Sequence, residues 1–319
     1  HICSNRIHNE SNNISGYSPI SRSYYKLWEI LYIIKNNIPN DSINVATIAE
    51  GPGGFTECII NFRKRNNPGI IDKIFGITLK SSDRDIPGWS KTNIFKDVNI
   101  SYGADNTGNI YNYSNIIHFT QTVGKNSCSI VTADGGFDFS NDFNRQEQSI
   151  YRLLLCEIVT AISVQKKGGI FICKFFDLHT VPTIKLYYLL NVLYEYTEII
   201  KPKMSRPANS EKYIVCVNFK GINDTYLTKL LYVIRYWDKI EKEEPIIDIF
   251  SSLYNITFFN MICKYNNYVA KKQTKYILKT FDIIKNDYNF KLLKQIQREY
   301  SISWCKKYNI PLNTNSKYI

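Results

Sequence analysis

The feature of this chain that most constrains its fold is an alternation of short apolar runs with longer helical segments between residues 43 and 219. The apolar runs have the length of strands, which we expect at Ile43–Ala49, Lys73–Leu79, Cys128–Ala133, Gly169–Phe175, Tyr196–Lys201 and Lys212–Phe219. Helices are expected between them, near Thr56–Arg65, Tyr111–Val123, Arg145–Gln165 and Val181–Tyr194. Strands that alternate with helices predict an α/β fold in which a parallel sheet is covered on both faces.

The last two expected strands break this alternation. Only the segment Pro202–Glu211 separates them, and it is too short for the helical crossover that neighbouring parallel strands need. We therefore expect a mostly parallel sheet that ends in an antiparallel hairpin.

Beyond Gly221 the strand pattern stops, and helices are expected at Thr225–Lys239, Pro245–Lys272 and Tyr288–Lys307. We therefore expect one domain over residues 1–222, which includes an N-terminal helix over residues 21–36. Residues 223–319 are expected to form a helical extension that packs on or beside this domain.

The chain is basic, with 40 Lys and Arg against 28 Asp and Glu among 319 residues and a formal net charge of +12. This excess favours a polyanionic partner, and a lysine-rich surface that reflects biased residue usage is the alternative. No apolar run reaches the roughly 18 residues of a membrane-spanning helix, so we expect no membrane segment. The eight cysteines form no C-x-x-C pair and the four histidines are scattered, which predicts free thiols in a reducing, intracellular compartment and no metal site.

Glycine-rich turns follow two of the expected strands, at the edge where an open α/β sheet binds ligands. The first is Ala49-Glu50-Gly51-Pro52-Gly53-Gly54-Phe55, in which glycines allow close approach of a ligand and Glu50 is suited to pair with a cationic group. The second is Asp134-Gly135-Gly136, whose carboxylate faces the same edge. A tight turn explains the first equally well, and a helix cap or Asx turn the second. The first lacks the full G-x-G-x-x-G spacing of a dinucleotide site.

Two charged residues have apolar neighbours in the sequence. Lys174 lies inside the expected strand Gly169–Phe175, where burial would lower its pKa and prepare it to act as a base. A lysine at a strand end whose ammonium reaches solvent is the alternative. Glu211 leads directly into an apolar strand, which a plain surface hairpin does not require.

Taken with their neighbours, these residues resemble a known family, the FtsJ-type ribose 2′-O-methyltransferases. Within it, the resemblance is strongest to the eukaryotic and viral enzymes that methylate the first transcribed nucleotide of capped mRNA. The blocks that carry it are Ser21–Ile30, Gly51–Phe55, Phe75–Lys80, Asp134–Phe137, Gly168–Leu178 and Ser205–Tyr213. The resemblance implies a Rossmann-like methyltransferase fold that uses S-adenosylmethionine, in which the terminal antiparallel hairpin replaces the all-parallel edge of dinucleotide-binding folds.

The family uses a Lys-Asp-Lys-Glu tetrad, and the matching residues here are Lys26, Asp134, Lys174 and Glu211. The resemblance implies that Lys174 takes the proton of the ribose 2′-hydroxyl, whose oxygen then attacks the sulfonium methyl group. We expect burial and repulsion from Lys26 to lower the pKa of Lys174, with Asp134 and Glu211 limiting that shift. The resemblance implies no requirement for a metal.

The resemblance also implies binding residues. Those for the cofactor are Ser21, Ala49, Glu50, Gly51, Pro52, Gly53, Gly54, Phe55, Asn109, Ile110 and Asp134. Asn109 departs from the family, which often has an aspartate there. Those for RNA are Asn144, Arg145, Gln146, Arg206 and Ser210, of which Arg206 has the fork geometry that suits a phosphate.

Three functions stay open on these residues. The first is a cap-dependent mRNA 2′-O-methyltransferase, whose partners are capped RNA and other capping or transcription proteins in the nucleus, the cytoplasm or a virus factory. The second is a ribosomal or transfer RNA ribose methyltransferase, and the third is a catalytically silent RNA-binding subunit. For residues 223–319 the choices are completion of the domain, docking of a protein partner, or an RNA clamp built from Lys271-Lys272 and Lys306-Lys307.

Overall fold

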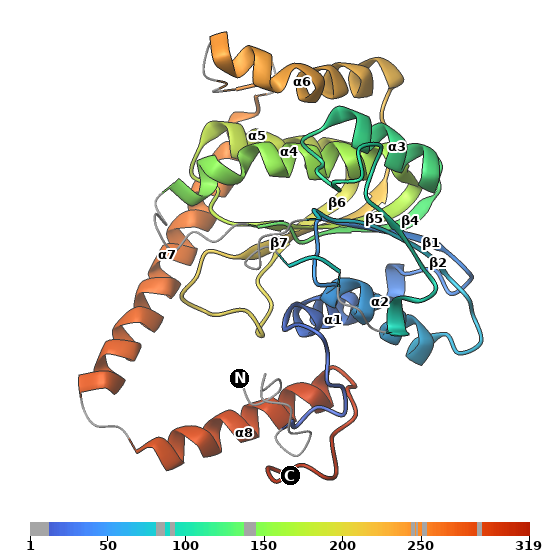
Figure 1. Ribbon diagram of the computed structural model, residues 1–319. Helices are drawn as coiled ribbons and strands as arrows, with labels where there is room; N and C mark the ends of the chain where they lie inside the picture. The colour runs from blue at the N-terminus through green and yellow to red at the C-terminus, as the bar shows by residue number, and fades with distance from the viewer. Residues whose placement is uncertain are drawn as a thin grey trace.

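A computed structural model describes residues 13–80, 87–89, 93–136, 145–243, 246, 248–250, 254–285 and 289–319 (Figure 1). In these residues one seven-stranded sheet has the order β3-β2-β1-β4-β5-β7-β6. Its strands are β1 (Asn44–Ile48), β2 (Lys73–Ile77), β3 (Val98–Ser101), β4 (Cys128–Ala133), β5 (Gln165–Phe175), β6 (Tyr194–Ile200) and β7 (Lys212–Phe219). Strands β1 to β5 pair in parallel, whereas β7 lies antiparallel between β5 and β6. The predicted parallel sheet with a terminal antiparallel hairpin is therefore confirmed.

Helices cover both faces of the sheet (Figure 1). One face carries α1 (Ser23–Ile33) and α2 (Gly54–Asn66), and the other carries α3 (Tyr113–Val123), α4 (Gln146–Val164) and α5 (Val181–Leu193). Successive residues of β1 point to opposite faces, so Val45 joins the hydrophobic core under α1 and α2, while Ala46 joins the core under α3, α4 and α5. This two-sided burial explains why the strands are nearly continuous apolar runs.

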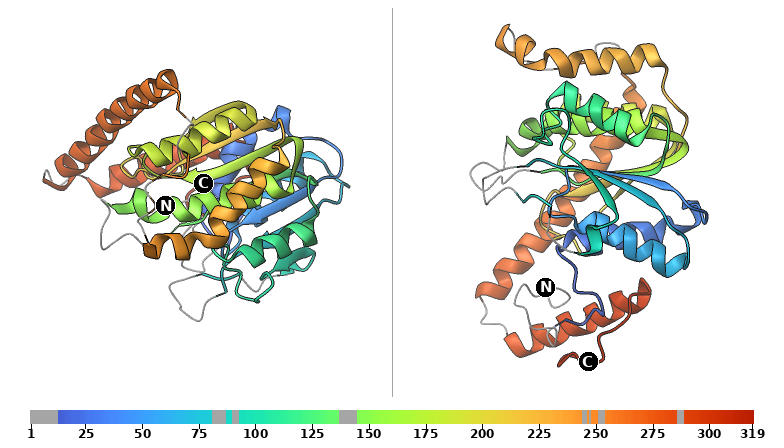
Figure 2. Two further views of the ribbon diagram at one scale, coloured as in Figure 1. Left: turned by 90° about the horizontal axis from the view of Figure 1, so that it is seen from above. Right: turned by 45° about the vertical axis from the view of Figure 1, so that its right-hand side comes forward.

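The C-terminal helices reach both of these cores. Helix α6 (Asp224–Glu243) lies over α3 and α4, and the first turns of α7 (Ile256–Lys285) bury Phe258 and Ile262 in the same core. Helix α8 (Phe290–Lys307) lies on the opposite side of the molecule, where Trp304 and Cys305 enter the core under α1 and α2 (Figures 1 and 2). No helix in the described ranges is long and apolar enough to cross a membrane.

Three sequence expectations differ from the structure. Strand β3 was not expected, because only its last residue, Ser101, is buried and the strand therefore lacks an apolar pattern. The helix expected at Pro245–Lys272 is wrong at both ends, since Asp248–Phe250 are not helical, α7 begins at Ile256, and it continues to Lys285. Helix α1 is shorter than expected, and a 3-10 turn follows it at Lys35–Asn37. Six described cysteines are buried free thiols, as expected, and Cys263 is exposed.

Candidate active site

The four residues of the expected tetrad meet at the carboxyl edge of the sheet, although they come from distant parts of the sequence. Asp134 directly follows β4, and Lys174 is the penultimate residue of β5. The antiparallel register pairs Lys174 with Tyr213, which brings Glu211 and the hairpin loop to the end of β5. Helix α1 supplies Lys26.

Two ion pairs connect these side chains. The Nζ atom of Lys26 lies 2.8 Å from each carboxylate oxygen of Glu211. The Nζ atom of Lys174 lies 3.3 Å from Oδ1 of Asp134 and donates a hydrogen bond of 2.9 Å to the backbone oxygen of the same residue. All four side chains are at most 16% exposed, so solvent screens both pairs weakly.

Neighbouring hydroxyl groups fix the two carboxylates. The phenol of Tyr213 donates to Oδ1 of Asp134 at 3.0 Å, and the Ser205 hydroxyl donates to Oε1 of Glu211 at 2.8 Å. Each carboxylate therefore accepts from a lysine and a hydroxyl, an arrangement that stabilises its charged form.

The expectation of a lowered pKa for Lys174 is wrong. Burial does lower the pKa of this ammonium, but the charges of Asp134, Glu211 and Glu157 together raise it above its ordinary value. The pKa of Glu211 is lowered. Burial raises it, but the charges of Lys26 and Lys174 lower it by more. At neutral pH Lys174 is therefore an ammonium ion in the free protein.

Glu157 is a buried acid that the sequence analysis missed. It lies in the middle of α4 and is inaccessible to solvent. Its Oε1 atom accepts a 2.9 Å hydrogen bond from the backbone N–H of Gly135, the residue after Asp134, and burial raises its pKa to about 8. The sequence did contain a signal for this acid, because Glu157 is a glutamate on the apolar face of a helix, where a charge without a partner is rare.

The glycine-rich turn after β1 also contains a buried carboxylate. Glu50 accepts hydrogen bonds from the backbone N–H groups of Phe55, at 2.9 Å, and Thr56, at 3.0 Å, so it caps the first turn of α2. Burial raises the pKa of Glu50 to about 8, and the charge of Asp134 raises it too. The turns after β1 and β4 meet, since a Cβ atom at Gly135 would lie 3.2 Å from the Cβ atom of Ala49. Gly54 lies against Ser21, since a Cβ atom at position 54 would be 2.1 Å from the Ser21 hydroxyl.

The expected Asn109-Ile110 segment reaches the same edge. A Cβ atom at Gly108 would lie 1.8 Å from the backbone oxygen of Thr78, and the Thr78 hydroxyl accepts a hydrogen bond of 3.2 Å from the N–H of Gly51. Both expected cofactor segments therefore pack around the end of β2. Ile110 is buried, whereas Asn109 is half-buried and accepts from the N–H of Tyr111 at 3.0 Å.

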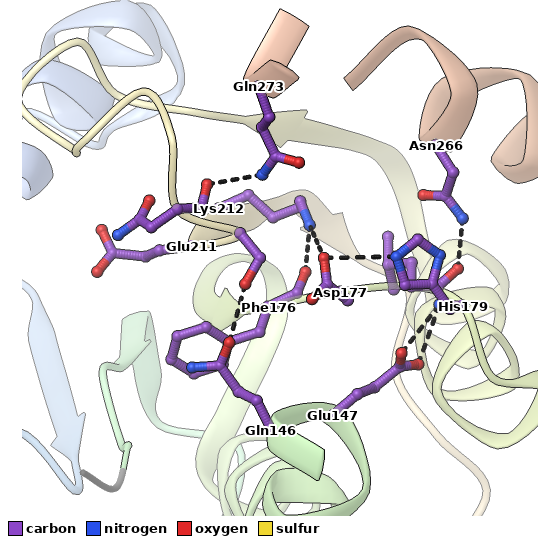
Figure 3. A network of polar contacts seen from close by, with 12 residues as sticks. Gln146, Glu147, Phe176, Asp177, His179, Glu211, Lys212, Asn266 and Gln273 are labelled. Atoms are coloured by element: carbon purple, nitrogen blue, oxygen red, sulfur yellow. Dashed lines mark hydrogen bonds and ion pairs between the residues drawn. The ribbon is translucent and has the colours of Figure 1, made fainter. Parts of the chain in front are cut away.

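The expected RNA-binding residues lie on the hairpin loop and at the start of α4. Two of them bind each other, because the Ser210 hydroxyl donates to Oε1 of Gln146 at 2.9 Å (Figure 3). Arg206 is exposed on the hairpin loop, and Arg145 is exposed just before α4. Asn144 lies outside the described residues.

Lys212 is a second buried lysine that the sequence analysis missed. Its ammonium donates to the backbone oxygen of Phe176 and lies 4.0 Å from Oδ1 of Asp177 (Figure 3). Burial lowers its pKa to about 8. Lys212 is the first residue of β7 and binds the segment that follows β5. It therefore holds β5, which carries Lys174, beside β7, which follows Glu211.

Comparison with known proteins identifies the family. A family model described as FtsJ-like methyltransferase matches residues 19–219. The chain belongs to this family. The match covers the sheet and all four tetrad positions, and it confirms the resemblance read from the sequence.

Curated relatives of this FtsJ-like methyltransferase include two cap-specific mRNA methyltransferases. The chain is 30% identical over 294 residues to cap-specific mRNA (nucleoside-2′-O-)-methyltransferase 1 of Dictyostelium discoideum. The matched region covers 86% of this chain and 38% of that protein. It is 38% identical over 192 residues to the Mus musculus protein of the same name, covering 58% of this chain and 22% of that protein. The chain thus spans less than half the length of either relative.

Among solved structures, a ribosomal RNA methyltransferase from Plasmodium falciparum is similar, with a TM-score of 0.47 and 21% sequence identity. The match covers 63% of this chain and 99% of that one.

Proposed function

We propose that this chain transfers a methyl group from S-adenosylmethionine to the ribose 2′-hydroxyl of the first transcribed nucleotide of capped RNA. The observation that carries the proposal is the convergence of Lys26, Asp134, Lys174 and Glu211 at the carboxyl edge of the sheet in two ion pairs. The names of the curated relatives favour capped mRNA over ribosomal or transfer RNA as the substrate.

The donor set at this edge fits a cationic cofactor. Asp134 lies beside the turn after β1, since its backbone N–H donates a hydrogen bond of 3.4 Å to the backbone oxygen of Ile48, and a carboxylate at this place favours a positive ligand. We propose that the cofactor is held by Ser21, the turn Ala49–Phe55, Asn109, Ile110 and Asp134. When bound, it supplies a methyl group on a positively charged sulfur atom.

In the proposed reaction Lys174 holds the 2′-hydroxyl by a hydrogen bond and receives its proton. Lys174 must first lose the proton that it carries in the free protein, because an ammonium ion cannot accept another. Asp134 and Glu211 fix the position of its Nζ atom, and Lys26 neutralises Glu211. Accurate placement of the hydroxyl supplies much of the rate enhancement.

The RNA path is proposed to pass the hairpin loop and the start of α4. Arg206 and Arg145 are exposed there on two neighbouring elements, and the Ser210–Gln146 hydrogen bond joins those elements. Asn144 belongs to the proposed RNA-binding set from its sequence position alone. Other capping or transcription proteins are proposed as partners from the family resemblance alone.

The test is methyl transfer from labelled S-adenosylmethionine to two RNAs of the same sequence, one capped and one with a 5′-triphosphate. Nuclease digestion locates the label, and Lys174→Ala is compared with Lys167→Ala, which changes an exposed lysine at the opposite end of β5. Label on the first ribose of capped RNA alone, lost only in Lys174→Ala, is expected. Equal labelling of both RNAs would favour a ribosomal or transfer RNA enzyme. Cofactor binding without transfer to either RNA would favour a silent RNA-binding subunit.

A further inference from the structure

A cavity outside the tetrad opens between α3, α4 and α6, the three helices that lie together on one side of the sheet (Figure 1). Its volume is about 650 Å³. Its lining residues are Asn109, Tyr111, Asn112, Tyr113, Ser114, Arg152, Ile234, Arg235 and Asp238. The cavity thus begins at Asn109, one of the residues proposed for the cofactor, and its far wall is the first helix of the C-terminal region.

Two arginines give this cavity an excess of positive charge. Arg152 pairs with Asp238 at 2.6 Å, and Asp238 is the single carboxylate among the lining residues. Arg235 is exposed on α6, and no described carboxylate forms an ion pair with it. An anion in the cavity would therefore meet one guanidinium that is already paired and one that is not.

Both guanidinium groups are held over aromatic rings. Arg152 lies 4.4 Å from the ring centroid of Tyr111, and Arg235 lies 5.5 Å from that of Tyr113. Such stacking fixes the plane of a guanidinium and leaves its edge available to bind a phosphate. The Nε atom of Arg152 is buried without a hydrogen-bond partner. The Arg152 guanidinium also lies 5.5 Å from the ring centroid of Trp237, so two aromatic rings fix its position.

The lining also suits a nucleotide base. Tyr113 is half-buried, and the side-chain amide of Asn109 can donate a hydrogen bond, whereas that of Asn112 caps α3 and donates to Asp105. Single-stranded RNA is commonly bound by aromatic rings that stack on bases beside cationic groups that bind phosphates. Two arginines, two tyrosines and two asparagines in one cavity match that combination.

We propose that this cavity is a second RNA-binding site, in which Arg152 and Arg235 bind a phosphate of the RNA chain at a distance from the methylated nucleotide. The proposal rests on the proposed function, because it takes RNA as the substrate. It gives α6 a role in substrate binding, and it predicts that long RNAs bind more tightly than short cap analogues.

The test measures RNA affinity directly, by fluorescence anisotropy of a capped 20-nucleotide RNA over a range of salt concentrations. Arg235→Ala and Arg152→Met are compared with wild type and with Lys229→Ala, which removes an exposed cation of α6 outside the cavity lining. Methionine at position 152 retains packing against Tyr111 and removes the charge.

Each arginine variant is expected to weaken binding about tenfold at low salt and to reduce the slope of log affinity against log salt by about 0.7, the value for one phosphate of a single strand. The RNA affinity of Lys229→Ala is expected to equal that of wild type. Methyl transfer to a capped dinucleotide by the two arginine variants is also expected to be unchanged. Wild-type affinity and slope in both arginine variants would overturn the proposal. The proposal would also be overturned if Arg235→Ala lost AMP binding but kept wild-type RNA affinity, since the cavity would then be a mononucleotide site.

The two proposals fail in different ways. If methyl transfer occurs and the arginine variants bind RNA like Lys229→Ala, the cavity proposal alone is wrong. If no RNA is methylated but the arginine variants show the reduced salt slope, the cavity binds RNA and the proposed reaction is wrong.

Discussion

Glu157→Gln tests the electrostatic description of the active site through stability. The carboxyl group of Glu157 has its pKa raised by burial from 4.5 to about 8, so the folded protein holds this proton more tightly than the unfolded chain does. The stabilising contribution is therefore fully present below about pH 4.5 and is lost as the pH rises toward 8. Glutamine keeps an oxygen that can accept the Gly135 N–H bond but cannot ionise, so the variant does not suffer this loss.

The magnitude follows from the two pKa values. Linkage between 4.5 and 8 gives a loss of about 2 kcal/mol for wild type between pH 6 and pH 8. With an unfolding entropy of about 2.1 cal/mol/K per residue, this corresponds to about 3 °C in Tm for a chain of this length. The Tm of Glu157→Gln minus that of wild type should therefore grow by about 3 °C from pH 6 to pH 8.

The assay is differential scanning calorimetry at half-unit pH steps. All other titrating groups are shared by the two proteins, so their contributions cancel in the difference. Glu195→Gln, which changes an exposed glutamate of β6, is the control, and its difference from wild type should not vary with pH. A constant Tm difference for Glu157→Gln across this range would refute the conclusion that burial raises the pKa of Glu157.

Three further predictions concern the tetrad and its supporting loop. If Lys174 must lose a proton to act, its raised pKa in the free protein predicts that kcat/KM for S-adenosylmethionine rises about tenfold per pH unit from pH 7 to pH 9; a plateau below pH 8 in this profile would contradict the prediction. Lys26→Met removes the ion-pair partner of Glu211, so it should lower the free energy of unfolding in urea by about 3 kcal/mol and abolish methyl transfer. Wild-type stability of this variant would contradict the prediction. Gly135→Ala places a Cβ atom 2.2 Å from Oε1 of Glu157, and should destabilise the protein by about 1–3 kcal/mol and displace the Asp134 loop, which the cofactor affinity and the urea midpoint would report.

Most of the fold could be predicted because hydrophobic periodicity is a local property. Strands β1, β2, β4, β5 and β7 are largely buried, so each contains an apolar run in the sequence, whereas the edge strand β6 is buried only at Tyr194 and Ile200. Strand β3 is largely exposed at the edge of the sheet and has no such run. The start of α7 was missed because nothing in the residues around Pro245 distinguishes a helix from the irregular segment that is present at Asp248–Phe250.

The positions of the tetrad were predicted from the resemblance to the family, and the geometry of a parallel sheet accounts for part of their convergence. The carboxyl ends of parallel strands meet at one edge, so Asp134 after β4 and the end of β5 had to be neighbours once the strand order was known. The ionisation state of Lys174 could not be predicted in the same way. It depends on several buried ionisable groups, and one of them, Glu157, comes from the middle of α4 and contacts the Asp134 loop only through its hydrogen bond with Gly135.

The charges of the site explain how a lysine with a raised pKa can still serve as a base. Lys26 and Lys174 carry two positive charges, Asp134 and Glu211 carry two negative ones, and Glu157 with a pKa of about 8 is mostly protonated at pH 7. The buried cluster is thus neutral in the free protein, and Lys174 keeps its proton because losing it would leave a net negative charge away from water. A positive charge placed beside Asp134 reverses this balance, since it repels the ammonium of Lys174 and compensates the charge that proton loss creates. In the proposed reaction the lysine therefore becomes a base only when a cationic ligand occupies the site, which couples its deprotonation to the presence of a group that can be transferred.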